Sequence, residues 1–437
     1  MRLRQLIIQN LVWRGLYFLS LFLLNVFVSR FFRAEASGSL YYIVNNLSLL
    51  LLLLGLSLES AATYYVAKNE IKPGQMALLC VLWTLLATLL SLVCQQWMGQ
   101  PAEGLFASRQ EYTLACGCYI AGVLLTTYFN ALFMARQEYL VPNLILFLVN
   151  LFMLLIIVLA HSMPGHPHLV FFYLASFLLQ GILVTGAYLL SMASTIRLGL
   201  PGLRECRKIG RYSLVALGAN LVFFLVYRID YWLVSKFCSP AQLGNYIQVS
   251  KLGQILLLLP AIFAANIFPR AASGKGEEIH LAIRRIIQML FLTGLVACLV
   301  LSLTGWWLFP FLYGSSFSLM PTCFILLVPG ILALTMVRIL AAYFAGINKV
   351  RYNLTGAAIS LVLIVIVDFI FIPRYGINAA AATSSLGYIS YLAFLLFSYR
   401  RHFSFRLIDF WAWQDIRKGN IVQMLKKELT GNTFPEP

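Results

Sequence analysis

The residues of this sequence that are best suited to chemistry are charged side chains inside long apolar runs. Placing a charge at membrane depth costs free energy, so such residues usually face a water-filled path or a charged partner. They comprise four basic residues, Arg14, Arg228, Lys251 and Arg338, and three acidic residues, Glu59, Asp230 and Asp368. Each one is a candidate for binding, ion coupling or charge pairing.

The basic residues are suited to holding a compact anion. Arginine stays charged and its planar fork grips phosphate-like oxygens in pairs, whereas lysine supplies a point charge. At a rise of about 1.5 Å per helical residue, Arg14 and Arg338 fall at one depth, and Arg228 and Lys251 fall at another. We predict that these four residues bind substrate at two anion stations, an inner one at Arg14 and Arg338 and an outer one at Arg228 and Lys251.

The acidic residues are candidates for ion coupling or for charge pairing. A membrane carboxylate can take up a proton or Na⁺ and link that ion to transport, and the sequence does not choose among Glu59, Asp230 and Asp368. Structural pairing is the alternative, in which Arg14 binds Glu59 and Lys251 binds Asp230 or Asp368.

Arg228 and Asp230 do not face each other on a helix. They are two positions apart, which is about 200° of rotation. Arg228 can also extend along the bilayer toward the headgroups, because long basic side chains keep their charge in water in this way. Because of the rotation between them, the two side chains cannot both point straight at one site.

The composition indicates a polytopic membrane protein. The chain has 437 residues, of which 61% are hydrophobic and 11% charged, and its mean hydropathy is +0.85. A soluble globular protein is excluded at these values. The net charge of +17 does not indicate nucleic-acid binding, because the basic residues lie in short loops between apolar runs, where they set orientation.

Apolar runs of spanning length predict an all-α protein with 12 transmembrane helices. The first run is long enough to span and no small-residue cleavage site closes it, so we expect a retained helix rather than a signal peptide. The predicted spans are 11–32, 40–66, 76–98, 112–135, 140–160, 169–193, 212–235, 243–268, 286–311, 319–345, 354–372 and 377–399.

Lys and Arg are concentrated in alternate loops, which places both termini in the cytoplasm. The most basic loop lies between two sets of six spans. We expect two pseudo-symmetric lobes around a central cavity, related as parallel repeats, because Tyr41 to Gly55 and Tyr246 to Pro260 share one spacing. The expected domains are residues 1–199, an N-terminal six-helix lobe, 200–211, a cytoplasmic linker, 212–400, a C-terminal six-helix lobe, and 401–437, an interfacial cytoplasmic tail.

Prolines inside spans remove a backbone hydrogen bond and favour bends. Pro260 and the neighbouring Pro329 and Gly330 are candidate hinges for movement of the lobes. A static kink held by packing is the alternative at each place.

The cysteines and histidines predict no metal site. The eight cysteines contain no CxxC pair, and most lie in apolar runs, as expected of small buried residues. His161, His166 and His168 lie close together in a short outer turn, but no carboxylate is near them in the sequence. We therefore expect neither a metal nor another cofactor.

Four stretches resemble the polysaccharide transporter family, the Wzx-type flippases of the MOP exporter superfamily. They are an acidic residue late in one span followed by LGNY and LLLLPAIFAANIFPRAA within 212–272, SRFFRAEASGSLYYIVNNLSLLLLLLGLSLESAATYYVAK, LYGSSFSLMPTCFILLVPGILALT, and DFIFIPRYGINAAAATSSLGY. The resemblance extends to about residue 401. The last stretch departs from the family, because Asp368 stands where Asn is usual.

The resemblance implies a flippase in the bacterial cytoplasmic (inner) membrane. Such a protein moves an undecaprenyl-diphosphate-linked oligosaccharide repeat unit, such as an O-antigen unit, to the outer leaflet by alternating access. The lipid bilayer and this lipid-linked oligosaccharide are the implied partners, together with polymerase and chain-length components of the same pathway. H⁺ or Na⁺ coupling is open.

Two other function classes are weighed against a flippase. A multidrug or metabolite exporter with two similar lobes is the main alternative, but it should carry acidic residues in its first span, where this chain has Arg14. A membrane enzyme acting on lipid-linked glycans would need a large extramembrane loop or clustered carboxylates for acid–base catalysis. The loops are short, so we do not expect an enzyme.

Overall fold

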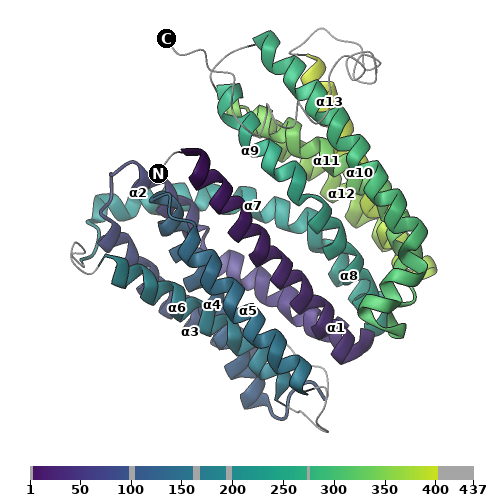
Figure 1. Cartoon of the computed structure of the whole chain (residues 1–437), viewed down its shortest axis with the longest axis horizontal. Coiled ribbons are helices and arrows are strands. Elements are labelled where there is room, and N and C mark those ends of the chain that lie inside the picture. The colour runs from purple at the N-terminus through teal and green to yellow at the C-terminus, as the bar shows by residue number, and fades with distance from the viewer. Residues whose placement is uncertain (1–2, 98–103, 161–167, 193–198, 273–275, 402–437) are drawn as a thin grey trace. The chain divides into compact units, whose positions relative to one another are not determined.

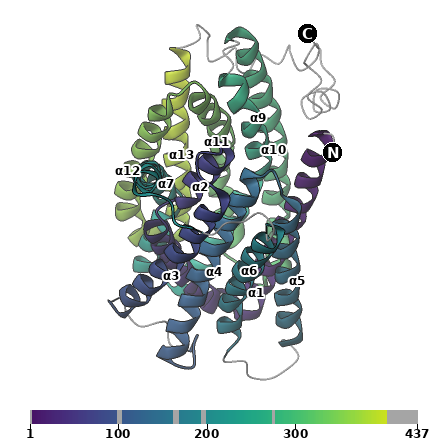
Figure 2. The same cartoon turned by 90° about the vertical axis from the view of Figure 1, so that its left-hand side faces the viewer.

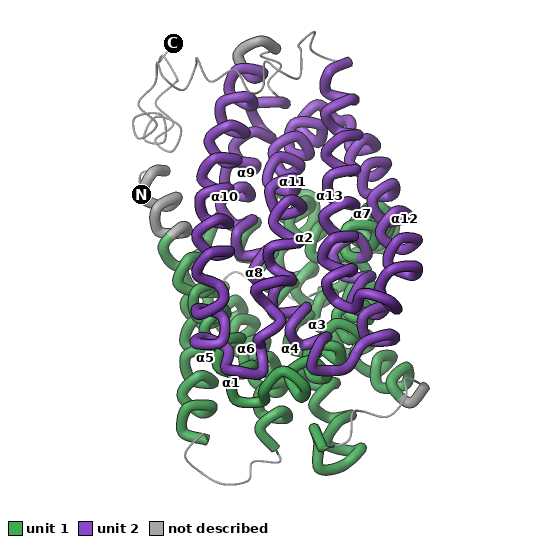
Figure 3. Tube along the Cα trace, turned by 90° about the vertical axis from the view of Figure 1, so that its right-hand side faces the viewer, with its two compact units in different colours: residues 1–224 green, residues 225–437 purple. Residues whose placement is uncertain are grey.

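A computed structural model of the chain describes residues 3–97, 104–160, 168–192, 199–272 and 276–401. The regular structure within these ranges is helical (Figure 1, Figure 2). The helices form two compact units, unit 1 with residues 1–224 and unit 2 with residues 225–437 (Figure 3). Helices satisfy their backbone hydrogen bonds internally, which a bilayer requires of any segment that crosses it.

Unit 1 is built from six helices and the first part of a seventh. These are α1 (Leu3–Gly55), α2 (Leu58–Ala67), α3 (Pro73–Trp97), α4 (Arg109–Ala135), α5 (Leu140–Ala160), α6 (Leu169–Ser191) and the start of α7 (Leu203–Phe237).

Unit 2 is built from the end of α7 and six further α-helices. These are α8 (Pro240–Leu256), α9 (Leu258–Ala272), α10 (Gly276–Tyr313), α11 (Met320–Gly346), α12 (Val350–Tyr375) and α13 (Ile377–Arg400), with a 3₁₀ helix, η1 (Ser315–Phe317), between α10 and α11.

The predicted multi-pass helical membrane protein is confirmed. The described residues contain ten helices that are long and apolar enough to span, or eleven if the bent pair α8 and α9 is one span. The first predicted span and the first part of the second lie on α1, whose 53 residues extend far beyond the roughly 30 Å of a bilayer core. Arg33 interrupts the helical geometry of α1 (φ 59°, ψ 177°) between those two spans.

A second break separates α1 from α2 inside the predicted second span. Leu56 and Ser57 both adopt left-handed backbone conformations, with φ of 54° and 53°. The last carbonyls of α1 accept hydrogen bonds from the Trp83 indole N–H, at 2.8 Å, and from the Tyr128 hydroxyl, at 2.9 Å. The Asn220 amide donates to the Ser57 hydroxyl at 3.0 Å. Side chains from α3 and α4 thus replace helical hydrogen bonds at this break, and α7 holds the side chain of Ser57.

A buried polar bridge holds the part of α1 that follows Arg14. The side-chain amide N–H of Asn150 on α5 donates to the Ser20 hydroxyl on α1 at 3.1 Å. The side-chain amide N–H of Gln180 on α6 donates to the side-chain oxygen Oδ1 of Asn150 at 2.9 Å. All three side chains are buried. Interhelical bonds of this type stabilise helix packing where water is absent, so the bridge fixes α1 against α5 and α6.

The helix α11 is the centre of unit 2. It packs against α8, α9, α10, α12 and α13, and 72% of its most apolar segment is buried, against 17% to 50% in the other candidate spans. Residues 331–337 and 339–340 are buried, but Arg338 is exposed. The sequence therefore places one exposed cation within the otherwise buried stretch 331–340 of α11.

The serine Ser385 of α13 inserts into the backbone of α11 beside Pro329 and Gly330. Its hydroxyl accepts from the Gly330 N–H at 3.1 Å and donates to the carbonyl of Leu326 at 2.7 Å. A Cβ added at Gly330 would lie 2.7 Å from the Cα of Ser385, so only glycine allows α13 this close. The predicted hinge at this position is thus packed tightly in the structure.

The junction of α8 and α9 is bent by 41°. Leu257 lies between the two helices, and Pro260 is in the first turn of α9. Proline is tolerated in a first turn, because its missing N–H has no helical partner there. The predicted proline hinge coincides with a real change of helix direction.

The expected boundary between the lobes and the division between the units differ in position. Residues 203–211 of the predicted linker are helical and begin α7, and the two units divide after Phe224, within the same helix. The predicted interfacial tail, 401–437, lies outside the described residues apart from Arg401.

Candidate functional site

In unit 1, the two predicted site residues Arg14 and Glu59 are separate. Arg14 is exposed, and its guanidinium carbon lies 5.7 Å from the centre of the Phe18 ring. Glu59 is in the first turn of α2, where the helix N-terminus favours a negative charge. Within the described residues the two side chains form no ion pair with each other.

In unit 2, the structure brings Arg228 of α7 and Lys251 of α8 within electrostatic range of each other. Both side chains are partly buried, and the Arg228 guanidinium carbon lies 5.9 Å from the centre of the Tyr231 ring. Two like charges in a poorly solvated place repel each other strongly. An anion between them would remove that repulsion, which is the chemistry predicted for the outer station.

The carboxylate of Asp230 on α7 is buried under hydroxyl groups. Its Oδ2 accepts hydrogen bonds from the Tyr246 hydroxyl of α8 and from the Ser384 hydroxyl of α13, the latter at 3.0 Å. Tyr246 and Ser384 are themselves 3.2 Å apart. The second oxygen, Oδ1, has no hydrogen-bond partner among the described residues, so the carboxylate is only partly satisfied.

The carboxylate of Asp368 on α12 is fully buried and still less satisfied. Neither of its oxygens has a hydrogen-bond partner in normal geometry within the described part of the chain. Asp230 and the Thr383 hydroxyl are the groups that act on it electrostatically. No ion pair joins either aspartate to a basic side chain among the described residues, so the alternative of a Lys251 pair is not observed.

Two carboxylates that share a buried region without a basic partner cannot both stay ionised at low cost. A proton or a small cation would remove the charge of one of them. We refer to Asp230 and Asp368 as the carboxylate pair.

Arg338 on α11 is surrounded by aromatic hydroxyl groups. Its guanidinium carbon is 5.9 Å from the centre of the Tyr227 ring on α7, and both Tyr227 and Tyr391 of α13 interact electrostatically with it. An exposed guanidinium beside tyrosine hydroxyls offers one charged and several neutral donors to an anion. The sequence predicted the arginine but not the tyrosines. Tyr391 could have been found from the spacing of Ser384, Tyr388 and Tyr391, which places three hydroxyl groups on one face of α13.

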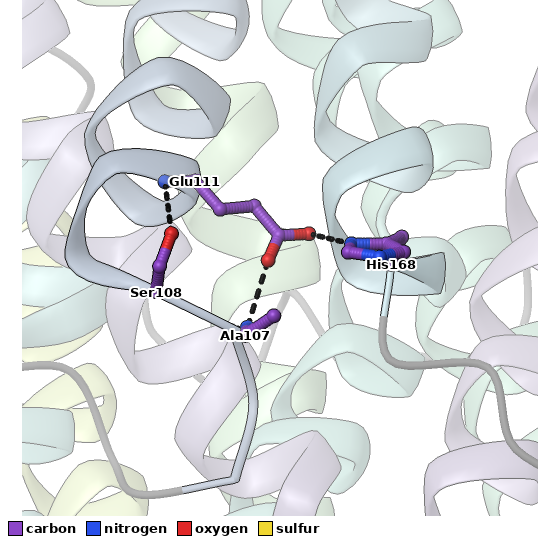
Figure 4. A network of polar contacts seen from close by, with 4 residues as sticks. All are labelled: Ala107, Ser108, Glu111 and His168. Atoms are coloured by element: carbon purple, nitrogen blue, oxygen red, sulfur yellow. Dashed lines mark hydrogen bonds and ion pairs between the residues drawn. The ribbon is translucent and has the colours of Figure 1, made fainter.

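His168, which immediately precedes α6, lies beside Glu111 of α4 (Figure 4). The Nδ1 of His168 is 2.8 Å from Oε1 of Glu111, and Oε2 of Glu111 accepts from the Ala107 N–H at 2.7 Å. The Glu111 N–H donates to the Ser108 hydroxyl at 3.1 Å. This carboxylate, distant in sequence, caps α4 and joins it to the start of α6.

Metal and disulfide chemistry have no support in the described residues. They contain no group of three His, Cys, Asp or Glu side chains placed to hold a metal ion, while His161 and His166 lie outside the described ranges. All eight cysteines, which are described, are free thiols.

Comparisons with known sequences find similarity over part of the chain. A sequence model of the family described as polysaccharide biosynthesis protein matches residues 134–322. The chain is also 23% identical over 220 residues to the probable low-salt glycan biosynthesis flippase Agl15 of Haloferax volcanii. That similarity covers 48% of this chain and 45% of the relative, so it spans less than half of either protein.

Solved structures share the fold over nearly the whole chain. The lipid II flippase MurJ, in an inward closed conformation, superposes with a TM-score of 0.73 at 14% identity and covers 99% of this chain and 94% of its own. A point mutant of the MATE transporter VcmN from Vibrio cholerae gives 0.64 at 14% identity, covering 91% and 96%. At these identities the likeness establishes the fold.

The comparisons agree with the resemblance of the four sequence stretches. Part of the chain is similar to the polysaccharide biosynthesis family, and the fold is the one that MurJ and the MATE transporters share.

Proposed function

We propose that the protein moves an undecaprenyl-diphosphate-linked oligosaccharide from the cytoplasmic to the outer leaflet by alternating access, for cell-surface polysaccharide synthesis. The observation that carries the proposal is the exposure and the proximity of basic side chains inside the apolar helices of unit 2. Arg338 is exposed within the otherwise buried stretch 331–340 of α11, and Arg228 and Lys251 lie within electrostatic range of each other. Such groups suit a substrate whose diphosphate must be neutralised before it can cross a bilayer.

The proposed topology has twelve crossings and both termini in the cytoplasm. Eleven candidate spans, with α8 and α9 counted as one, become twelve if α1 crosses twice and reverses at Arg33. The basic loops then face the cytoplasm, as the positive-inside rule requires. The membrane we propose is the cytoplasmic membrane of a prokaryote.

Each predicted site residue receives a role in this proposal. Arg338 binds one phosphate group with the help of the Tyr227 and Tyr391 hydroxyls, and the Arg228 and Lys251 pair binds the diphosphate at a second depth. Arg14 of unit 1, which is exposed and has no ion pair with Glu59, adds a further cation for the anion to meet.

The carboxylate pair is the proposed coupling site. Its buried position and its incomplete hydrogen bonding favour uptake of a proton or Na⁺ when the surroundings supply one. Glu59 is the corresponding candidate in unit 1, where the first turn of α2 stabilises its charge. Of the predicted hinges, Pro260 fits movement best, because the helix direction already changes beside it.

A multidrug or metabolite exporter is the second candidate, because MATE transporters share the fold. A cationic drug would bind to the carboxylate pair, whereas a lipid diphosphate would bind to the basic residues. Thermal unfolding of the purified chain in detergent distinguishes the two. Undecaprenyl diphosphate carrying an oligosaccharide should raise the unfolding temperature, and Arg338→Ala should reduce that rise. Stabilisation by organic cations and not by the lipid diphosphate would instead favour the exporter.

A further inference from the structure

A line of hydroxyl groups runs through unit 2 from the carboxylate pair toward Arg338. Ser384, Tyr388 and Tyr391 occupy positions i, i+4 and i+7 of α13, so they lie on one face of the helix. Tyr227 and Asp230 on α7 lie beside that face, through the contacts described next. The function proposed above uses the two ends of this line but not its middle.

Each neighbouring pair along the line interacts. The Arg338 guanidinium carbon is 5.9 Å from the Tyr227 ring centre, and the Tyr227 and Tyr388 ring centres are 5.9 Å apart. The hydroxyl of Tyr388 interacts with Ser384 and with Asp230. Ser384 in turn donates to Asp230 at 3.0 Å. We call Tyr227, Tyr388 and Ser384 the hydroxyl relay.

Burial makes this line effective in transmitting charge. Tyr388, Ser384 and Asp230 are 5%, 1% and 1% exposed, respectively, whereas Arg338 is exposed. In a medium of low dielectric constant, dipoles and charges act on one another over longer distances than in water. A change of charge at the buried end is therefore felt at the exposed end.

We propose that the hydroxyl relay couples the charge of the carboxylate pair to anion binding at Arg338. The inference rests on the proposed function, because it assumes that Arg338 holds a diphosphate. With the pair ionised, the Ser384 hydroxyl is directed to Asp230, and the negative charge opposes an anion. When the pair binds a proton or Na⁺, the hydroxyls no longer have to point at Asp230 and can donate toward the anion.

The direction of the coupling follows from this arrangement. Neutralising the pair strengthens anion binding at Arg338, and by thermodynamic reciprocity an anion at Arg338 strengthens cation uptake at the pair. The proton comes from water and forms an O–H bond on one carboxylate, and Na⁺ binds without any bond being broken. Loss of the cation weakens anion binding, which is the order needed to release substrate.

The other groups that face the pair do not change charge near neutral pH. The titratable side chains that interact with it are Tyr231 of α7, Tyr246 of α8, Cys323 of α11 and Tyr388 of α13. Phenols and thiols are neutral there by their ordinary values. Arg228 interacts with Tyr231, and Lys251 of α8 interacts with Arg228. A variant that lacks both aspartates therefore shows which part of a pH effect belongs to the pair.

The test measures binding of geranylgeranyl diphosphate to the full chain in lipid nanodiscs by calorimetry. Titrations at about pH 6 and about pH 8, with and without Na⁺, give the linkage between the two sites. The wild type should bind more tightly when the pair is neutralised, by about fivefold or more, within the usual range of allosteric coupling. The double variant Asp230→Asn, Asp368→Asn should bind tightly with and without Na⁺. Any pH dependence that it keeps belongs to the diphosphate, which titrates in this range, and is subtracted from that of the wild type.

Tyr388→Phe interrupts the relay between its two ends. The phenyl ring keeps the packing but removes the hydroxyl, so the affinity of the neutralised protein should fall toward that of the ionised protein and the linkage should drop below about twofold. Ser384→Ala tests the same connection independently should Tyr388→Phe lower the yield of folded protein. Tyr399→Phe, another buried tyrosine of α13 whose hydroxyl bonds to His280 at 2.9 Å, is the matched control and should retain the linkage of the wild type.

The outcomes distinguish the two proposals. If the wild type does not bind the polyprenyl diphosphate, the proposed substrate class is wrong and the relay loses its role. If the wild type binds with linkage that Tyr388→Phe and Ser384→Ala both keep, the relay is overturned while the proposed function stands. Equal loss of linkage in Tyr399→Phe would also overturn the relay, because the effect would then not be specific to its residues.

Discussion

Buried polar side chains are bonded to one another in the core of unit 1, whereas in unit 2 two buried carboxylates lack full partners. The bridge of Ser20, Asn150 and Gln180 connects three helices through hydrogen bonds of 3.1 and 2.9 Å. Asp230 and Asp368 are buried as deeply, but three of their four oxygens have no hydrogen-bond partner among the described residues. Equally buried polar side chains are thus fully hydrogen-bonded in the bridge of unit 1 and only partly hydrogen-bonded in the carboxylate pair of unit 2.

The difference indicates which polar residues serve packing and which serve transport. A neutral amide that finds its partners contributes to helix packing and has no need to change. A carboxylate held without a basic partner is costly in the resting protein, which suggests that another state supplies what is missing. The function proposed here therefore places ion coupling in unit 2.

The largest expected effect is that of Arg338→Ala. Removing the exposed guanidinium takes away the charged donor for the diphosphate, and hydrogen bonds to charged groups contribute about 1.5–3 kcal/mol. We expect the initial transport rate at limiting substrate to fall by about 10- to 100-fold. The measurement is the rate in proteoliposomes at matched protein content. Arg285→Ala, which removes an exposed arginine at the start of α10, serves as control, and an equal loss in both variants would contradict a specific role.

The next largest effect concerns ion coupling and contrasts the two units directly. The double variant Asp230→Asn, Asp368→Asn should reduce the response of transport to an imposed pH or Na⁺ gradient by about tenfold, because the amides cannot take up a cation. Glu59→Gln in unit 1 should preserve that response, because the proposed coupling site is the carboxylate pair of unit 2. Gradient dependence that persists in the double variant and disappears in Glu59→Gln would transfer the coupling site to unit 1.

Gly330→Ala should affect stability more than transport chemistry. The added Cβ would lie 2.7 Å from the Cα of Ser385, and overpacking of this kind costs about 1–3 kcal/mol. Thermal unfolding in detergent should therefore shift to lower temperature. Gly294→Ala is the control, because its Cβ would meet only the side chain of Leu332 at 3.4 Å. An unchanged unfolding temperature for Gly330→Ala would mean that α11 and α13 separate easily there.

The smallest effect is expected from Asn150→Ala in unit 1. It removes the centre of the polar bridge and leaves Gln180 without its acceptor, which costs about 1 kcal/mol in membrane proteins. The unfolding temperature should fall slightly. Transport per folded molecule should stay at the wild-type level, and a transport defect without loss of stability would show that this bridge has a functional role after all.

Much of the fold could be predicted from hydropathy, because spanning length and polar loops are properties of the sequence itself. The interruption of α1 at Arg33 falls between two predicted spans, and the bend beside Pro260 has a local cause in proline. The break at Leu56 and Ser57 was not foreseen. Neither residue favours a left-handed backbone, and the conformation depends on hydrogen bonds from Trp83 and Tyr128, which are distant in sequence.

The sequence predicted the charged residues of the candidate site but not the hydroxyl groups that surround them. Arg228 and Lys251 were assigned to one depth from helical rise alone, and the structure brings them within electrostatic range. The bonds from Tyr246 and Ser384 to Asp230 depend on how three helices pack, which local sequence does not encode. The lack of an ion pair at Asp368 among the described residues is also a property of packing, and the sequence left a pair with Lys251 open.

The most direct test of the proposed function is movement of the lipid itself. The purified chain is reconstituted in liposomes with undecaprenyl diphosphate that carries a fluorescent oligosaccharide, and an impermeant quencher reports how much label reaches the far leaflet. We expect protein-dependent movement by the wild type and movement close to that of protein-free liposomes by Arg338→Ala. Wild-type liposomes that show no more movement than empty ones, under both pH and Na⁺ gradients, would contradict the flippase function.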